Sequence, residues 1–380
     1  MKESKVFSFF SGSGFLDFGF EKAGFEIVFV NEIFKPFLDA YKYTRNNKIP
    51  EFGYSDTCIE SILESEDVIE TLKSNLRKCK RNGFHTGFIG GPPCPDFSNA
   101  GKHKGFKGEN GRLTNVYFDL ITECEPDWFL FENVEGLFKT KKHREFFDKL
   151  MEKTKSKGYI INYDVVNALE FGVPQDRERV LFFGIKRTLA RKDAIENPDT
   201  ETLYKSYHEI KSLNTRAYAK FSLNEIRKTS WPSTRDFTGY AGLSSPEGII
   251  EKLTVEHWFQ NNQVESHPNS KHHFKPTVGN NRFFEIKEGC VSGKSYKRLH
   301  RWRYSPTAAY GNNEVHLHPY RARRISAAES LAIQSMPRSF ALPEAMSLTN
   351  MFKTIGNGVP FLMANSVAKS IKNYLRFIQE

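Results

Sequence analysis

The sequence has few of the residues that mark secreted, metal-binding or membrane proteins. It contains 5 cysteines in 380 residues, none paired as CxxC or spaced as in a metal finger. The histidines also lack the spacing of a zinc site. No apolar run approaches the ~20 residues that span a bilayer, and the start does not read as a signal peptide. We therefore expect a cytoplasmic protein with no metal, no disulfide framework and no membrane contact.

What is present is ordinary in composition but basic. Hydrophobic residues make up 39% and charged residues 26%, which is typical of a globular protein. The formal net charge is +10, which favours a polyanionic partner. The length is sufficient for a sizeable core and predicts two domains.

The first 32 residues have the pattern of a nucleotide-type pocket. A buried strand over 5–10 meets the small-residue turn 11–14, a helix follows, and a second strand over 26–30 ends on Asn31-Glu32. The glycines let the backbone approach a ligand, the helix N-terminus faces it, and Glu32 can accept both hydroxyls of a ribose. The alternative is an ordinary tight turn between a strand and a helix.

A second carboxylate follows near position 56. Ser55-Asp56-Thr57 reads as the end of a third strand, which would bring Asp56 to the same pocket. On local grounds Asp56 could equally cap the next helix.

The most informative stretch is Gly90-Gly91-Pro92-Pro93-Cys94. An apolar strand runs into two glycines and two prolines, so one thiol is held rigidly at the carboxyl end of a strand, where open α/β sheets bind ligands. The alternative is a small buried hydrophobe on a turn. The glycine-rich, basic segment 99–108 then reads either as a lid whose lysines meet phosphates or as a solvated loop.

Further polar groups follow strands that would belong to the same sheet. The apolar strand 128–131 ends on Glu132-Asn133-Val134, which should share the sheet edge of Cys94. Between strands over 160–166 and 180–185, Arg177 and Arg179 stand two residues apart and could project into one cleft. The alternative is a surface salt-bridge ladder with Asp176 and Glu178.

From about 187 to 318 the regular alternation of strands and helices stops. Basic and aromatic residues interleave at 271–273, 298–303 and 321–324, a pattern that suits phosphate contacts and stacking on bases. The alternative is an ordinary basic surface. A helix over 326–334 and a tight turn at 355–360 precede a C-terminal helix that should return to the sheet of the first domain.

Taken together, these motifs resemble the DNA (cytosine-5)-methyltransferase family, in the form found in bacterial restriction–modification. The matching segments are the cofactor loop 10–14, the acids Glu32 and Asp56, the nucleophile loop 91–94, the ENV motif 132–134, the QxRxR motif 175–179, the helix motif 324–337 with Glu329 and Gln334, and the last motif 356–360. Two positions depart from the family pattern: Pro95 stands where Gln is common, and Ser8 stands where Asp is usual.

The resemblance implies an α/β fold. Residues 1–188, completed by 352–380, would form a Rossmann-like S-adenosylmethionine-dependent methyltransferase domain, and 189–351 a smaller, irregular target-recognition domain. The implied catalytic residues are Cys94, Glu132, Arg177 and Arg179. Those implied for the cofactor are Phe10, Ser11, Gly12, Ser13, Gly14, Glu32, Ile33, Asp56, Thr57, Pro93 and Asn357. Expected DNA contacts are Ser98, Lys102, Lys104, Arg301 and Arg303.

The implied activity is transfer of a methyl group from S-adenosylmethionine to carbon 5 of a cytosine within a specific duplex DNA sequence, leaving S-adenosylhomocysteine. The base would be flipped out and held covalently on Cys94. The protein would act as a monomer, and a cognate restriction endonuclease would act independently of it. Two alternatives are an RNA cytosine-5 methyltransferase of the same fold and a DNA-binding relative without catalysis.

Overall fold

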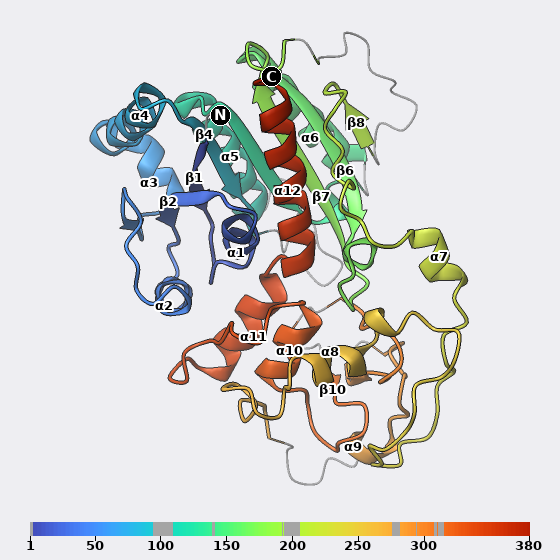
Figure 1. The fold of residues 1–380 in the computed structure, drawn as a ribbon. Coiled ribbons are helices and arrows are strands. Elements are labelled where there is room, and N and C mark those ends of the chain that lie inside the picture. The colour runs from blue at the N-terminus through green and yellow to red at the C-terminus, as the bar shows by residue number, and fades with distance from the viewer. Residues whose placement is uncertain are drawn as a thin grey trace.

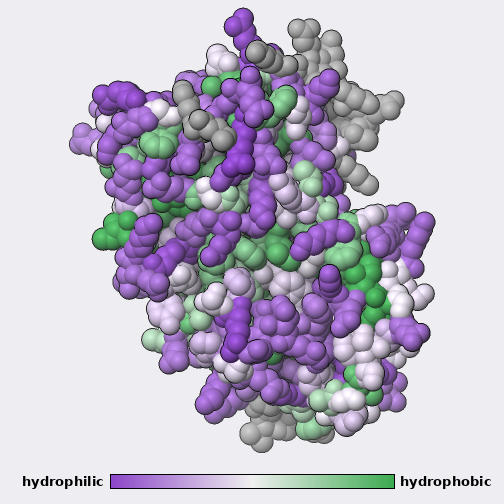
Figure 2. All heavy atoms as spheres, in the orientation of Figure 1, coloured by the Kyte–Doolittle hydropathy of each residue, from purple (hydrophilic) through white to green (hydrophobic). Residues whose placement is uncertain are grey.

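The computed structural model describes residues 3–93, 109–138, 141–191, 193, 206–275, 282–293, 295–307, 310 and 315–380. Figure 1 shows two lobes joined at the N-terminal end of the long helix α12 (Phe361–Phe377). We call residues 3–213 and 358–380 the sheet lobe and residues 214–357 the small lobe. Figure 2 shows hydrophilic residues over most of the face in view, as expected for a chain with a net charge of +10.

The sheet lobe is built on an eight-stranded sheet of order β3-β2-β1-β4-β5-β7-β6-β8. Strands β3, β2, β1, β4 and β5 run parallel, whereas β7 is antiparallel to both β5 and β6. The carboxyl ends of the parallel strands therefore share one edge, the usual ligand edge of such sheets. The strands are β1 Ser4–Phe9, β2 Glu26–Asn31, β3 Tyr54–Ser55, β4 His85–Gly90, β5 Trp128–Asn133, β6 Tyr159–Asn167, β7 Glu178–Lys186 and β8 Ser206–His208.

Helices cover both faces of this sheet, which confirms the predicted α/β class. On one face α1 and α12 pack in a core with Phe20, Trp128 and Val367. On the other, α3 to α6 pack in a core with Phe88, Phe118 and Phe182. None of the described helices is long and apolar enough to cross a membrane. The helices of this lobe are α1 Phe15–Lys22, α2 Lys35–Thr44, α3 Ile59–Glu64, α4 Glu66–Arg81, α5 Glu109–Cys124, η2 Glu135–Phe138, α6 Lys141–Ser156, η3 Ala168–Phe171 and α12.

The small lobe has short elements separated by long irregular segments. Irregular backbone leaves carbonyl groups that need donors, and the buried Arg298 supplies several. Its guanidinium donates to the carbonyls of Ile286, His318 and Phe283. The elements are α7 Leu223–Lys228, η4 Glu251–Leu253, α8 Val255–Asn261, α9 Arg282–Glu285, β9 Lys297–Arg298, β10 His316–Leu317, α10 Ala327–Ile333 and α11 Leu348–Asn357.

Both predicted domain boundaries need correction. The boundary at 188/189 would place β8 in the second domain, but β8 pairs with β6 in the sheet, and Leu213 lies in the core beneath α12. The boundary at 351/352 falls inside α11, a continuous helix. Hydrophobic periodicity did not reveal β8, because that strand has only three residues. The C-terminal helix does return to the sheet, as predicted.

Candidate active site

The loop after β1 has the backbone geometry of a ligand-binding turn. Phe10, Gly12 and Gly14 have φ angles of 51°, 56° and 79°, a region that favours glycine. The amide of Gly12 donates to Glu32 Oε2 at 2.8 Å, and the amide of Phe34 donates to Glu32 Oε1 at 2.8 Å. Glu32, which directly follows β2, therefore holds the glycine loop that follows the neighbouring strand β1.

Glu32 and Asp56 follow neighbouring parallel strands. Burial raises the pKa of Glu32, although the amides of Phe34 and Gly12 oppose the shift. Asp56 is exposed, and α3 begins at an N-cap, Cys58, without a side-chain hydrogen bond, so Asp56 does not cap that helix. Ile33 lies beside Glu32 with 59% of its surface exposed, and the partly buried Thr57 accepts Asn31 Nδ2 at its carbonyl. These side chains thus lie at one end of β2 and β3.

The last motif lies against the glycine loop. The tight turn expected at 355–360 is shorter in the structure, because α11 continues to Asn357 and only 358–360 connect it to α12. Thr354 in α11 donates its hydroxyl to Ser13 Oγ at 2.8 Å, and both side chains are buried. Asn357 is exposed at the end of α11.

A buried network behind the glycine loop was not predicted. Asp17 in α1 accepts the hydroxyls of Ser8 and Tyr41, each at 2.9 Å. Arg45 packs over the Tyr41 ring and donates to the carbonyl of Gly14 at 2.9 Å. The position where related sequences usually carry Asp, here Ser8, therefore contacts a carboxylate supplied by the following helix. Nothing in the sequence spacing indicates this contact.

We expect Asp17→Asn to alter the pH dependence of stability. Burial raises the pKa of Asp17 to about 6, despite the nearby charge of Arg45. The folded protein therefore holds a proton that the unfolded chain releases at lower pH, and wild-type stability falls as pH rises from about 4 to 6. Asn does not ionise, so the variant should gain on the order of 1 kcal/mol relative to wild type between about pH 5 and pH 7. Urea unfolding at both values measures the change, and a difference independent of pH would contradict it.

The predicted catalytic acid lies at the expected edge of the sheet. Glu132 is the fifth residue of β5, and its carboxylate forms an ion pair with Arg179 at the start of β7, with Oε1 2.8 Å from Nε. The two side chains are only 9% and 11% exposed. Burial raises the pKa of Glu132, while the charges of Arg179 and Arg177 oppose the rise. The pair thus forms a desolvated acid beside a fixed cation.

The loop that carries Cys94 starts directly against this acid. A Cβ atom on Gly91 would lie 2.9 Å from Glu132 Oε2, so only glycine allows the backbone to pass this close to the carboxylate. Pro93 is exposed. Cys94 itself lies outside the described residues, as do Ser98, Lys102 and Lys104.

Arg177 and Arg179 differ in their surroundings although both lie near Glu132. Arg177 is 1% exposed, and its Nη2 donates to the carbonyl of Gly356 at 3.0 Å. Gln334 in turn donates to the carbonyl of Ile355 at 2.5 Å and accepts Gln175 Nε2 at 3.2 Å. Burial and the charge of Arg179 lower the pKa of Arg177. Arg177 therefore ties the QxRxR segment to the last motif, while Arg179 pairs with Glu132 and Asp176 pairs with Arg227.

The expected DNA contact at Arg301 is corrected by the structure. Arg301 is 1% exposed, forms an ion pair with Glu288 at 2.9 Å, and donates to the carbonyl of Ala241 at 3.0 Å. Arg303 is partly buried, and its Nε donates to the carbonyl of Pro232. The cluster at 298–303 mainly cross-links the small lobe, because arginine also satisfies buried carbonyls and carboxylates.

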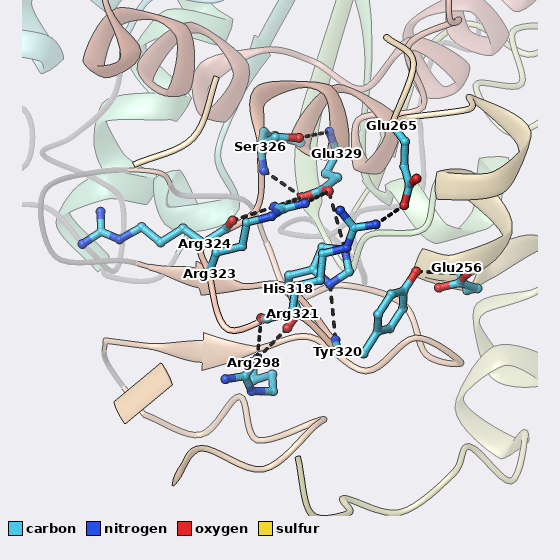
Figure 3. A network of polar contacts seen from close by, with 11 residues as sticks. Glu256, Glu265, Arg298, His318, Tyr320, Arg321, Arg323, Arg324, Ser326 and Glu329 are labelled. Carbon is cyan, nitrogen blue, oxygen red and sulfur yellow. Dashed lines mark hydrogen bonds and ion pairs between the residues drawn. The ribbon is translucent and has the colours of Figure 1, made fainter. Parts of the chain in front are cut away.

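Glu329, in the first turn of α10, holds the segment that leads into this helix (Figure 3). It forms a capping box with Ser326, accepts Arg323 at 2.7 and 2.9 Å, and lies 3.5 Å from His318 Nε2. Burial lowers the pKa of His318 to about 3. Figure 3 shows the Arg324 guanidinium pointing away from this network, and it lies 5.2 Å from the centre of the Phe274 ring.

Comparison with known proteins identifies the family. A family model described as C-5 cytosine-specific DNA methylase matches residues 4–373. The chain is 50% identical over 377 residues to the Type II methyltransferase M.NmeDI of Neisseria meningitidis serogroup C, covering 98% of this chain and 84% of that protein. It is 28% identical over 390 residues to the Type II methyltransferase M.FnuDI of Fusobacterium nucleatum, covering 98% and 95%.

Solved structures share the fold. A DNA modification methyltransferase encoded within an E. coli prophage superposes with a TM-score of 0.63 at 22% identity, covering 99% of this chain and all of that one. The S. pombe Dnmt2 methyltransferase gives a TM-score of 0.57 at 13% identity, covering 99% of each chain. The family model and the relative at 50% identity define one class, and the chain belongs to the C-5 cytosine-specific DNA methylases. It is thus a DNA cytosine-5 methyltransferase that uses a methyl donor.

Proposed function

We propose that this enzyme transfers a methyl group from S-adenosylmethionine to carbon 5 of a cytosine in a specific duplex sequence, through a covalent bond between Cys94 and the base. The observation that carries the proposal is the desolvated Glu132–Arg179 pair, with Gly91 of the thiol-bearing loop packed against the Glu132 carboxylate. A carboxylic acid, an arginine and a thiol are the groups that activation of a cytosine ring requires.

The residues present at the ends of β1, β2 and β3 fit the proposed methyl donor. The loop 10–14 has positive φ angles, and the space beside Gly12 is open to 4 Å from where a Cβ atom would lie, which allows a ligand to approach closely. Glu32 still has lone pairs for ribose hydroxyls, because each oxygen accepts one amide. The exposed Ile33 and Asp56 offer an apolar surface and an acceptor for an adenine ring. S-adenosylmethionine would supply a methyl group on a positively charged sulfur.

The chain's own groups would act in a fixed order. A Cys94 thiolate adds to carbon 6 of cytosine, and the electron density moves toward carbon 5. Glu132 donates a proton to the ring nitrogen as negative charge develops there, which suits a pKa raised by burial. Arg179 faces the carbonyl oxygen of the base, where charge also grows. After carbon 5 has been methylated, a base removes its proton, the ring nitrogen returns its proton to Glu132 and the bond to Cys94 breaks, which restores both the carboxylic acid and the thiolate.

A cytosine inside a duplex is out of reach of all these groups. We therefore propose that the base is flipped from the helix, that the segment 95–107 closes over it, and that the small lobe reads the surrounding sequence. Ser98, Lys102, Lys104 and Arg303 remain proposed DNA contacts.

We also propose that the enzyme acts as a cytoplasmic monomer in a restriction–modification system, with a cognate endonuclease that acts independently. The support is the likeness to two Type II methyltransferases along nearly the whole chain.

The test is methyl transfer from tritiated S-adenosylmethionine to duplex DNA and, in parallel, to total RNA. We expect label at carbon 5 of DNA cytosine, and sequencing of the modified sites would define the target. Cys94→Ser serves as the control and should transfer no label. Label only in RNA would move the assignment to an RNA methyltransferase, and cofactor binding without transfer to either would indicate a DNA-binding relative without catalysis.

A further inference from the structure

A side-chain clamp, the pair of Asp176 and Arg227, joins the small lobe to the segment that carries Arg179. Asp176 immediately precedes Arg177 and lies three residues before Arg179. Its carboxylate is held by Arg227 from α7 through two contacts, Nη1 to Oδ2 at 2.9 Å and Nη2 to Oδ1 at 3.0 Å. Such a two-pronged contact fixes orientation as well as distance. The Asp176 side chain therefore cannot turn without breaking its contacts with Arg227.

The same clamp contacts both lobes. Asn167, at the end of β6, donates its amide to Asp176 Oδ1 at 2.7 Å. On the small-lobe side, Arg227 Nη1 also donates to the Tyr304 hydroxyl at 3.1 Å. The Tyr304 ring packs edge-on against Trp231, 5.2 Å between ring centres. Asp176 thus joins β6 of the sheet lobe with two segments of the small lobe.

Backbone contacts run alongside these side chains. Ser305 pairs with Gln175 in a parallel bridge, its amide donates to the Pro174 carbonyl at 2.8 Å, and its carbonyl accepts Asp176 N at 2.9 Å. The Thr307 hydroxyl donates to the Asp176 carbonyl at 2.6 Å. A movement of segment 304–307 therefore shifts the backbone from which Arg179 extends toward Glu132.

From this arrangement we infer that Asp176 and Arg227 are positioning residues, which couple docking of the small lobe on the target sequence to the placement of Arg179 against the base. The inference rests on the proposed function. Neither residue touches the reacting atoms. The clamp acts through geometry, because a displacement of about 1 Å in a catalytic group is enough to slow a reaction strongly. It predicts that the correct sequence raises the rate of the chemical step and not only the affinity.

The experiment compares Arg227→Gln with Lys228→Gln, which removes one charge from the next, exposed position of α7. Single-turnover methyl transfer is measured at saturating protein and cofactor on two unmethylated duplexes. One carries the sequence that the wild-type enzyme recognises, and the other differs from it by a single base pair. For Arg227→Gln we expect the rate on the correct site to fall about tenfold, with the rate on the altered site nearly unchanged. Lys228→Gln should match the wild type on both.

Further measurements separate coupling from other roles. Asp176→Asn should give a similar loss, and the double variant should be no slower than Arg227→Gln alone, because both remove one contact. Arg227→Lys should recover part of the rate. Equal losses on both duplexes would overturn the inference in favour of a general structural role. A weaker DNA affinity with an unchanged saturated rate would overturn it in favour of a direct phosphate contact. A wild type that methylates no DNA would instead refute the proposed function.

Discussion

Replacement of Glu132 by Gln should lower the rate of methyl transfer by about 10²–10⁴, while DNA and cofactor binding change much less. Gln keeps the size and hydrogen-bonding capacity of the side chain but has no acidic proton to transfer. The effect should be large because this carboxyl is buried beside Arg179 and cannot be replaced by solvent. Single-turnover rates at saturating DNA and cofactor measure it, together with separate binding constants.

A matched control exists near the other end of β5. Glu125 stands just before that strand and pairs with Lys186 at 2.5 Å, with 46% of its side chain exposed. Glu125→Gln should leave the rate within about twofold of wild type, since rim ion pairs of this kind contribute little. If Glu132→Gln retained the wild-type rate, the proposed role of this carboxyl in proton donation would be wrong.

Replacement of Arg301 by Met should destabilise the protein by about 3 kcal/mol, because it leaves the buried Glu288 carboxylate with less compensation. The two side chains are 1% and 2% exposed, and Arg235 also contacts Glu288, at 2.7 Å. Met keeps most of the side-chain volume, so the loss reports charge and hydrogen bonds more than a cavity. Urea unfolding followed by circular dichroism provides the measurement.

The control is Arg321→Met, which breaks an ion pair with Glu265 whose partners are 43% and 71% exposed. Exposed pairs contribute at most about 1 kcal/mol, so this variant should unfold close to the wild type. An equal decrease in the free energy of unfolding of the two variants would show that burial does not make the Arg301–Glu288 pair more important for stability than an exposed pair.

The Arg301 pair also predicts an effect of acid. Burial alone would raise the pKa of Glu288, but hydrogen bonds from Arg301 and Arg235 hold it below the usual glutamate value. The contribution of ionised Glu288 to the stability of the folded protein is therefore present above the ordinary glutamate pKa. It is lost as pH falls through the lower pKa that Glu288 has in the folded state. The stability difference between wild type and Arg301→Met should narrow in that acidic range.

The sheet and the residues at its carboxyl edge could be predicted from local sequence. The aromatic run before Glu132 forms a buried central strand. A short, fully apolar segment of this length is typical of a strand that is covered on both faces in an α/β fold. Glu32 directly follows a second buried strand, and its contact with Gly12 lies within one strand–turn–helix–strand unit. The family resemblance rested on these short segments, whose geometry depends on neighbouring residues.

The small lobe could not be predicted in the same way. A run such as Arg298 to Arg303 has the composition of a nucleic-acid surface, but arginine is also the best single donor for buried carbonyls. Which role an arginine takes depends on the acceptors that distant segments bring to it. Arg301 meets Glu288 and Ala241, and Arg298 meets Ile286 and His318. The hydrophobic periodicity of the sequence does not predict these contacts.

By itself, the sequence determined the α/β class, the sheet edge at which Glu32 and Glu132 lie, and the family, because strand patterns and turn residues act over short distances. Only the tertiary structure decided that Arg177 ties two motifs together, that Asp17 accepts the Tyr41 hydroxyl behind the glycine loop, and that Asp176 is held by Arg227 across the two lobes. These contacts join residues that are distant in the chain. Packing brings the partners together, and the cost of burying an unpaired polar group makes the pairing specific.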